Sequence, residues 1–446
     1  MHFTQMISIN KIEQYVSKKY GHFGPNKSRE IIRLLFEITK RDKCSIADIR
    51  LFPKTSDFAK IKIELLKKRY PKYFNHNNSS FYLPKLKVEP ALKAHTKTRK
   101  IYPREVFVEK TVRESELTKQ MQGFFPKAKF SYIDSLKTLL KTQGFSLEKY
   151  NSRAERFFVA KETHDFFKAC PCTTNVLPCG FNIINLGFGC PYECSYCFLQ
   201  GYQNFPGIIF PANVEDFFKN FKIHTLKSFI FPYARIGSGE FTDSLVFDNI
   251  TNFSTRIIDF MSGYQDIYFE FKTKSKNIEN FLDAKPQKNI VVSWSLNPQK
   301  IISENEFCTT SLEERLISAS ECAKLGYGVG FHFDPIIHYS SWENDYKNVV
   351  NQIFSKIPDK SIKWISLGTL RMPAELKKVI ESRFPDNELL DAELLLGKDH
   401  KLRYHEAVRT DIYKKMNSWI KEQSKKPIVY LCMETKEIWN RSQMVY

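Results

Sequence analysis

Near the middle of the chain stands Cys190-Pro-Tyr-Glu-Cys194-Ser-Tyr-Cys197-Phe-Leu-Gln200, with three cysteines spaced by four and then three residues. Three thiolates at this spacing can converge on one small inorganic cluster and leave it one protein ligand short. The apolar, β-rich residues 181–188 predict a strand, and a helix is expected to begin at Ser195. We therefore expect the cysteines on a loop at the carboxyl end of a strand, where α/β barrels carry their chemistry.

Other uses of the three cysteines remain open at this point. They fit a zinc site completed by a histidine or a fourth cysteine, or a set of buried, unreactive thiols. Disulfides are disfavoured, because we see no signal peptide and ten cysteines in 446 residues are too few for a disulfide-held secreted fold. Ligand spacing favours a cluster over zinc.

The C-x3-C-x2-C spacing, with an aromatic residue before the last cysteine, resembles the cluster-binding loop of radical S-adenosylmethionine (SAM) enzymes. Further segments resemble the spore photoproduct lyase family, DNA-repair enzymes that split thymine dimers by radical chemistry. These segments are Cys197–Gln200, Lys272–Lys274, Ser293–Asn297, Gly328–Pro335 and Trp342–Tyr346. The similarity runs from about Phe166 to Trp439 and leaves the first third of the chain uncovered.

The resemblance implies two cofactors, a 4Fe–4S cluster on Cys190, Cys194 and Cys197 and SAM at its open iron. One electron would cleave SAM to a 5′-deoxyadenosyl radical that abstracts hydrogen from the substrate. The implied SAM-binding residues are Tyr196 against the adenine, Ser238, Gly239 and Glu240 at the methionine moiety, Lys274 and Ser295 as polar contacts, and Asn297 at the ribose. Each could instead be a polar residue bonded only to neighbouring backbone, but their joint occurrence at successive strand ends favours the ligand role.

Two positions depart from the family pattern. Spore photoproduct lyases resemble this chain but carry a cysteine in the place of Gly239 and a tyrosine in the place of Phe198, both linked to hydrogen return to the product radical. Glycine and phenylalanine cannot supply that hydrogen atom. We therefore expect another donor, or a different substrate or reaction; the candidate catalytic donors are Cys432, Tyr233 and Tyr404.

A second group of cysteines precedes the loop. Cys170, Cys172 and Cys179 with a distant fourth ligand would suffice for a second metal site. Buried thiols in a segment leading into the barrel are an equally good interpretation.

Strands and helices alternate regularly after the cysteine loop, which predicts an α/β fold, a partial (β/α)6 radical SAM barrel. The predicted strands are 181–188, 227–233, 267–272, 290–296, 328–332 and 364–368. The predicted helices are 248–261, 278–282, 311–325, 343–354 and 373–383.

Positive charge is concentrated at the start of the chain. The net charge is +19, and residues 1–100 hold 23 Lys and Arg against 8 Asp and Glu, whereas the other 346 hold 45 against 41. A basic module of this kind suggests a nucleic-acid partner, although a solvated lysine-rich surface would look similar. The predicted elements of the module are helices at 27–40, 45–48 and 58–69 and a strand at 81–88, an order compatible with a winged helix.

The expected domains are a basic, mostly helical module at 1–85, a connector with a helix at 86–165, the barrel at 166–439 and a tail at 440–446. The connector helix is expected at 132–142. No run of about 18 apolar residues is present, so we expect no membrane span and a cytoplasmic protein.

The leading functional hypothesis is a radical SAM enzyme acting on nucleic acid, most simply a lyase that repairs a pyrimidine photolesion in DNA by carbon–carbon bond cleavage. The alternatives are radical SAM modification of RNA or a peptide, and a metal-stabilised nucleic-acid-binding protein without turnover. The expected partners are DNA and an electron donor such as flavodoxin or ferredoxin. DNA would be contacted by the basic module and by barrel-mouth cations, namely Arg235, Arg371, Lys401, Arg403 and Arg409.

Overall fold

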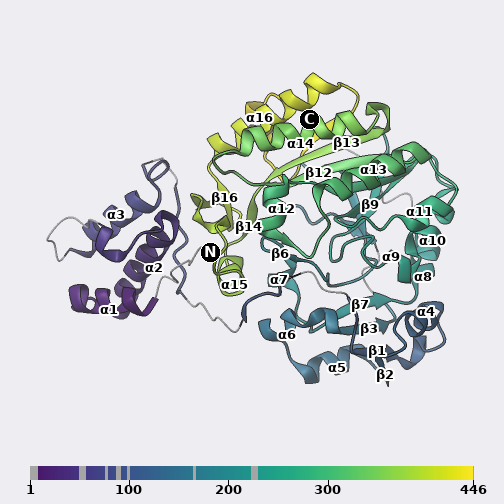
Figure 1. Cartoon of the computed structure of the whole chain (residues 1–446), viewed down its shortest axis with the longest axis horizontal. Helices are drawn as coiled ribbons and strands as arrows, with labels where there is room; N and C mark the ends of the chain where they lie inside the picture. The colour runs from purple at the N-terminus through teal and green to yellow at the C-terminus, as the bar shows by residue number, and fades with distance from the viewer. Residues whose placement is uncertain are drawn as a thin grey trace. The chain divides into compact units, whose positions relative to one another are not determined.

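The computed structural model describes residues 9–49, 57–75, 79–86, 92–97, 101–163, 167–221 and 230–444. The chain divides into two compact units, which are coloured along the sequence in Figure 1. Unit 1 comprises Met1–Lys93 and Arg371–Glu406, and unit 2 comprises Ala94–Leu370 and Ala407–Tyr446. The domain boundaries at 85, 165 and 439 remain predictions from sequence. No helix in the described residues is long and apolar enough to cross a membrane.

Unit 2 is built on an eight-stranded sheet with the strand order β17-β13-β12-β10-β9-β8-β5-β4. All neighbouring strands are parallel except β4 and β5. Figure 1 shows helices such as α10, α11, α13 and α14 around the outside of the strands. The predicted α/β partial barrel is confirmed. The strands are β4 (Phe167–Ala169), β5 (Phe181–Ile184), β8 (Ala234–Ser238), β9 (Ile267–Thr273), β10 (Ile290–Ser295), β12 (Gly328–Ile336), β13 (Ile362–Thr369) and β17 (Ile428–Leu431).

Two strands differ from the sequence-based expectation. The strand expected at 227–233 is wrong over its described part: β8 begins at Ala234, and Phe231 instead packs its buried ring on Trp364. Residues 227–229 lie outside the described residues. Strand β17 was not expected, because four residues after a long helix give little periodic signal.

The outer helices follow from local signals in the sequence. Helix α13 (Leu312–Leu325) begins with a capping box, in which Ser311 Oγ accepts from the Glu314 N–H and the Glu314 carboxylate accepts from the Ser311 N–H. It ends at Gly326, whose φ of 105° suits glycine. Further helices are α8 (Val214–Asn220), α9 (Asp248–Thr251), α10 (Phe253–Met261), α11 (Glu279–Asp283), α12 (Gln299–Asn305), α14 (Trp342–Lys356), α16 (Glu406–Gln423) and α17 (Lys436–Arg441). With helices on one face and a filled interior on the other, strands such as β10 are buried along their whole length.

A second sheet has four parallel strands in the order β2-β1-β3-β7. Its first three strands in sequence come before the cysteine loop, and β7 comes after it. Its strands are β1 (Glu105–Glu109), β2 (Lys129–Ile133), β3 (Arg156–Ala160) and β7 (Ile208–Pro211). The helix expected at 132–142 is α5 (Leu136–Gln143), and α4 (Glu116–Phe124) and α6 (Leu147–Asn151) accompany it. The strands of this connector region were not expected from sequence.

Unit 1 combines a helical bundle with a small antiparallel sheet. Helices α1 (Ile9–Tyr20), α2 (Pro25–Asp42) and α3 (Phe58–Arg69) enclose a core that includes Ile12, Leu34 and Leu65. The sheet has the order β14-β16-β15, with β14 (Arg371–Pro373), β15 (Leu394–Leu396) and β16 (Lys401–Tyr404), next in sequence to α15 (Leu376–Arg383).

The strand expected at 81–88 is wrong over residues 81–86, which form no strand. Phe81, Leu83 and Leu86 pack against the helical core instead. Residues 87 and 88 lie outside the described residues. The wing of a winged helix is therefore not seen in the part of this segment that the structure describes.

A buried ion network holds unit 1 together around Glu37. Its carboxylate receives Arg33 Nε at 2.9 Å, Arg69 Nε at 2.7 Å and Lys377 Nζ at 2.6 Å. Burial alone would raise the pKa of Glu37, but these cations hold it well below its usual range. Arg69, in the last turn of α3, is thus buried inside the unit.

Candidate functional site

The cysteine loop lies between β5 and α7 (Leu199–Tyr202), and two backbone contacts fix it. The short strand β6 (Glu193–Cys194) pairs with β11 (Glu306–Phe307), with Cys194 opposite Glu306. Before the loop, Phe188 and Ile209 exchange two backbone hydrogen bonds, at 3.0 and 2.8 Å. Gly189, between Phe188 and Cys190, has a φ of 95°. A Cβ at this position would lie 2.9 Å from the carbonyl oxygen of Gly207, so glycine is required.

Arg153 holds the backbone of the cysteine loop by hydrogen bonds. Its buried guanidinium donates from Nε to the carbonyl oxygen of Cys190 at 2.7 Å and from Nη2 to that of Tyr192 at 2.6 Å. Nη1 donates to Glu193 Oε1 at 2.8 Å. Burial alone would lower the pKa of Arg153, but Glu193 raises it, so the side chain stays charged. One arginine therefore sets the backbone of the first half of the loop.

The three loop thiols share one electrostatic environment. Burial raises the pKa of Cys190 to about 12, with further contributions from Asp243 and Cys197. Burial also raises the pKa of Cys194 well above its usual value; Lys274 acts against this, and Glu306, Cys197 and Cys190 add to it. Crowded thiols that repel one another as thiolates fit a cationic iron–sulfur cluster, which would relieve that repulsion.

Beside the cysteines, Tyr196 and Asn297 meet at a buried carboxylate. The Tyr196 hydroxyl donates to Glu306 Oε1, and Asn297 Nδ2 donates to the same oxygen at 2.8 Å. Tyr346 completes the arrangement by donating to Asn297 Oδ1 at 2.5 Å. Burial alone would raise the pKa of Glu306, but Arg315 and Lys274, with the Tyr196 and Asn297 hydrogen bonds, lower it to about 2.

Lys274 is the lysine of this arrangement, and it lies beside Tyr196 and Glu306. Its Nζ lies 5.8 Å from the centre of the Tyr196 ring. Burial alone would lower its pKa, but Glu306 and Cys194 raise it, so it is protonated at neutral pH. Its backbone N–H donates to Asp243 at 2.6 Å, which ties the end of β9 to the segment after β8. Arg315 contacts Glu306 at 2.7 Å and donates to the carbonyl oxygen of Ser295 at 2.8 Å.

The predicted SAM-binding segment Ser238–Glu240 begins at the last residue of β8, and Lys274 directly follows the neighbouring strand β9. Ser238 Oγ donates to Ser244 Oγ at 2.8 Å, and Glu240 pairs with Lys168 at 3.1 Å. Gly239 has a φ of 99°, and a Cβ there would lie 2.9 Å from the carbonyl oxygen of Lys272. The backbone at this position is thus suited to glycine, and the segment from Ser238 to Asp243 contains no cysteine.

The candidate hydrogen donors lie in three different surroundings. Tyr233 stacks on Tyr268 with ring centres 4.0 Å apart, and burial raises its pKa to about 12. Cys432 follows β17 beside Cys170, whereas Tyr404 belongs to β16 of unit 1. Phe198, the position that differs from the family pattern, is 39% exposed.

The prediction that Arg235 lies at the barrel mouth, where it could contact DNA, is wrong. Arg235 is 1% exposed and pairs with Glu270 at 2.9 Å inside the barrel, where Glu270 also meets His332 at 2.7 Å. Arg235 belongs to the parallel strand β8, and both faces of such a strand are covered, so its side chain is buried. Arg409 is also buried and paired with Glu434, and Arg403 is paired with Asp399.

Sequence reasoning missed the residues that orient the site. Arg153 lies 37 residues before Cys190, and Glu306 lies 110 residues after Tyr196. Neither belongs to a motif. The only available signal is that Glu306 and Arg315 follow the predicted strand 290–296 within the same βα connection.

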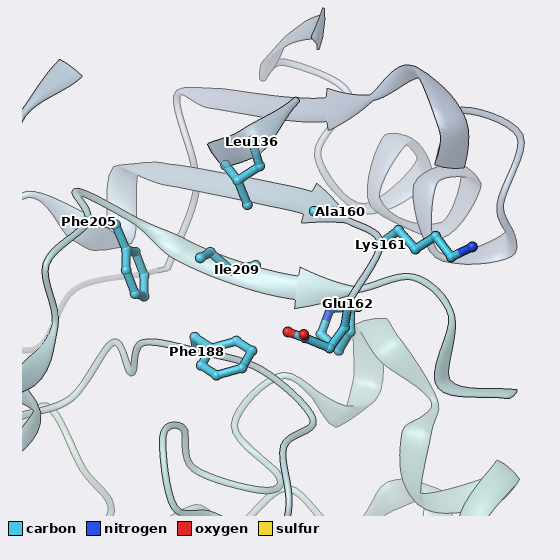
Figure 2. A pocket seen from close by; sticks show the side chains of 8 residues that line it. Leu136, Ala160, Lys161, Glu162, Phe188, Phe205 and Ile209 are labelled. Atoms are coloured by element: carbon cyan, nitrogen blue, oxygen red, sulfur yellow. The ribbon is translucent and has the colours of Figure 1, made fainter. Parts of the chain in front are cut away.

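A separate pocket of about 220 Å³ is lined in part by Phe188, just before the cysteine loop. Figure 2 shows Leu136, Ile209 and the rings of Phe188 and Phe205 along this pocket, with the Glu162 carboxylate directed toward Phe188. Its lining is mostly apolar and holds none of the predicted site residues, so we assign the chemistry to the cysteine loop.

Comparison with known proteins agrees with this geometry. A model of the spore photoproduct lyase family matches residues 147–431. The spore photoproduct lyases of Geobacillus sp. (strain Y412MC61) and Bacillus subtilis (strain 168) are each 26% identical to the chain, over 209 and 253 residues. These matches cover 46% and 55% of this chain, and 61% and 71% of those proteins.

A solved spore photoproduct lyase complexed with dinucleoside spore photoproduct shares the fold, with a TM-score of 0.62 and 21% identity, over 75% of this chain and 100% of that one. The family model covers more than half of the chain, including the cysteine loop and the β-strands whose ends surround it. The chain belongs to the spore photoproduct lyase family.

Proposed function

We propose that the chain is a radical SAM enzyme that acts on nucleic acid and repairs a pyrimidine photolesion in DNA by carbon–carbon bond cleavage. The observation that carries the proposal is the cysteine loop, which Arg153 holds and whose Tyr196 lies beside Lys274 and Asn297 at neighbouring strand ends. Family membership supports it, because the matched relatives are spore photoproduct lyases.

In this proposal Cys190, Cys194 and Cys197 hold a 4Fe–4S cluster. When bound, the cluster and SAM would supply one-electron radical chemistry for hydrogen abstraction from the substrate. The electrostatic contacts among the three thiols, two of which also interact with Lys274, support this assignment.

The protein's own residues would bind and orient SAM. Lys274, kept protonated by Glu306, suits the SAM carboxylate, and Glu240 suits the ammonium group. Tyr196 would pack on the adenine, and Asn297 would bond a ribose hydroxyl, each oriented by its hydrogen bond to Glu306. The proposed remaining contacts are Ser238, Gly239 and Ser295. Burial of most of these groups would keep water from a reactive radical.

Hydrogen return to the product requires a donor within this chain or its substrate. Cys432, Tyr233 and Tyr404 are the proposed candidates, since an S–H or phenolic O–H can give up a hydrogen atom and neither Gly239 nor Phe198 has one. An electron donor such as flavodoxin or ferredoxin would supply the electron for SAM cleavage, in the cytoplasm. DNA would be met by lysines of unit 1.

The test uses cluster-reconstituted, reduced full-length protein with SAM and ultraviolet-irradiated DNA that contains spore photoproduct. We expect 5′-deoxyadenosine to form and intact thymine to be recovered, and Cys194→Ala to lose iron and both products. The matched control is Cys44→Ala in unit 1, which should retain them. Formation of 5′-deoxyadenosine without loss of the lesion would refute the repair function, and full iron content in Cys194→Ala would refute the cluster assignment.

A further inference from the structure

A buried carboxylate that the proposed chemistry does not use lies inside the barrel of unit 2. Glu270 of β9 is fully buried. Its Oε2 accepts from Arg235 Nη2 at 2.9 Å, and its Oε1 meets His332 Nε2 at 2.7 Å. The same Oε1 accepts from Trp364 Nε1 at 2.7 Å and from the Ser293 hydroxyl. These four partners belong to four other strands, so Glu270 is a central acceptor of the barrel interior.

Gly330 on β12 leaves room for these bonds. A Cβ at this position would lie 2.3 Å from Ser293 Oγ and 2.6 Å from Trp364 Nε1. The indole ring is rigid and fully buried, so a side chain at position 330 would push two of the donors away from Glu270. The convergence of donors on this carboxylate therefore depends on the glycine.

The ionisation of Glu270 decides which nitrogen of His332 carries the proton. Burial alone would raise the pKa of Glu270, but its contacts with His332 and Arg235 hold it well below its usual range. A carboxylate only accepts hydrogen bonds, so His332 Nε2 must donate. Burial and the charge of Lys272 lower the pKa of His332, although Glu270 acts against them. The ring is therefore neutral at neutral pH, and its Nδ1 is an acceptor.

His332 lies between Glu270 and the candidate active site in the register of the sheet. Glu270 pairs with Val291, and Val291 with Gly328, so His332 is four residues nearer the carboxyl ends of the strands. Its own partner on β10 is Ser295, a proposed SAM contact, and paired residues place their side chains on the same face. The His332 side chain is 6% exposed, and Nδ1 makes no hydrogen bond to the residues that the structure describes.

We propose that His332 is a specificity-determining residue that binds the imide edge of a pyrimidine ring in the lesion. This inference rests on the proposed function. A thymine ring carries an N3–H donor between two carbonyl acceptors, and His332 Nδ1 would accept from N3–H. Lys272 lies two residues after Glu270 on the same face of β9, where its ammonium would donate to a neighbouring carbonyl oxygen of the ring. Glu270 is the positioning residue, because it fixes the tautomer of His332.

This contact selects the kind of pyrimidine that the barrel accepts. A site built to bond a substrate N–H rejects an analogue that lacks it, because the buried acceptor is then left without a partner. The N3 atom of cytosine is an acceptor, so its lone pair would face the lone pair of His332 Nδ1. The inference therefore predicts a preference for lesions of thymine over lesions of cytosine.

The test compares two ligands that differ only at N3, the dinucleoside spore photoproduct and its derivative methylated at N3 of both rings. The ligands are titrated calorimetrically into reconstituted full-length protein with SAM, without a reductant, so that no turnover occurs. We expect the unmodified ligand to bind about 10–100-fold more tightly. Equal affinities would overturn the inference and leave the repair function standing. Failure to bind either ligand would refute the lesion as the substrate, and the inference with it.

Variants show whether His332 causes the difference between the two ligands. His332→Ala should remove most of this difference, because the acceptor is lost and the methyl group gains space. His332→Asn keeps an acceptor oxygen near the position of Nδ1 and should retain a larger part of it. A merely structural role would weaken the binding of both ligands alike, so the ratio of the two affinities is the informative quantity. An unchanged ratio in His332→Ala, or equal ratios in the Ala and Asn variants, would overturn the inference.

A matched pair of variants tests the positioning role of Glu270. Glu270→Gln removes the charge that fixes the tautomer of His332, and should lower the ratio of affinities although His332 is intact. Ser293→Ala removes another bond to Glu270 but keeps its charge, and should show the ratio of the parent protein. Circular dichroism confirms that each variant is folded. A ratio that falls as far in Ser293→Ala as in Glu270→Gln would contradict the positioning role.

Discussion

Glu37 in unit 1 and Glu306 in unit 2 are both buried carboxylates with lowered pKa values, yet their surroundings differ. Glu37 is met by three cations, two of them on other elements, α3 and α15. Glu306 forms an ion pair with Arg315 and also feels the charge of Lys274, while neutral donors on Tyr196 and Asn297 occupy its other oxygen.

The difference separates a structural use of buried charge from a functional one. Around Glu37 the three contacts are ion pairs, two of which connect α2 to other helices, and none of the groups is a candidate ligand contact. Around Glu306 the neutral donors are side chains proposed to touch SAM. A carboxylate surrounded by cations fixes a fold, whereas one bonded to neutral donors orients groups that still have a face for a ligand.

The largest effect is expected from Glu37→Gln. Removal of the carboxylate charge leaves Arg33, Arg69 and Lys377 buried beside one another, and breaking a buried pair costs about 3–5 kcal/mol. Urea denaturation of the full chain, followed by circular dichroism, should show this loss in the transition that reports the helical bundle. The control is Glu64→Gln on α3, whose exposed pair with Lys67 should contribute at most about 1 kcal/mol. Equal midpoints for the two variants would remove the structural role assigned to Glu37.

A smaller, local effect is expected from Glu306→Gln. The substitution keeps a hydrogen-bond acceptor for Tyr196 and Asn297 but removes the charge that raises the pKa of Lys274. Loss of charge-assisted contacts of about 1.5–3 kcal/mol predicts SAM binding weaker by about 10–100-fold, with iron content unchanged. Calorimetric titration of SAM into reconstituted protein measures it. Glu304→Gln, an exposed neighbour on α12, is the control. If the variant lost iron as well, Glu306 would belong to the support of the cysteine loop rather than to SAM binding.

The two networks also explain what could be predicted from sequence. The spacing of Cys190, Cys194 and Cys197 is local, and the placement of Lys274 and Asn297 at strand ends follows from regular βα alternation. These features depend on residues within one or two elements. The fold class was therefore accessible, and so were the positions that became neighbours around Tyr196.

The rest depends on contacts between distant residues. Arg153 reaches the carbonyl oxygens of the cysteine loop from a segment that composition presents as a connector. Arg33 meets Glu381 across 348 residues, so its charge could not be recognised as internal. The same limitation made Arg235 look like a mouth residue, because charge patterns in sequence do not reveal which face of a buried strand carries them.

The smallest effect is expected on the salt dependence of DNA binding, when exposed lysines of unit 1 rather than its buried cations are replaced. Lys18 on α1 and Lys60 on α3 are exposed, in contrast to Arg33 and Arg69. If the surface lysines meet DNA phosphates, Lys18→Ala with Lys60→Ala should reduce the slope of log affinity against log salt by about 0.9 for each contact, and so by about 2 in total. Binding of a DNA duplex between about 50 and 200 mM salt measures that slope, with Lys324→Ala on α13 of unit 2 as the control. The double variant should unfold within about 0.5 kcal/mol of the parent, because exposed substitutions touch little. An unchanged slope at unchanged stability would mean that the positive charge of unit 1 serves solubility and its internal ion pairs, and that the nucleic acid is held elsewhere.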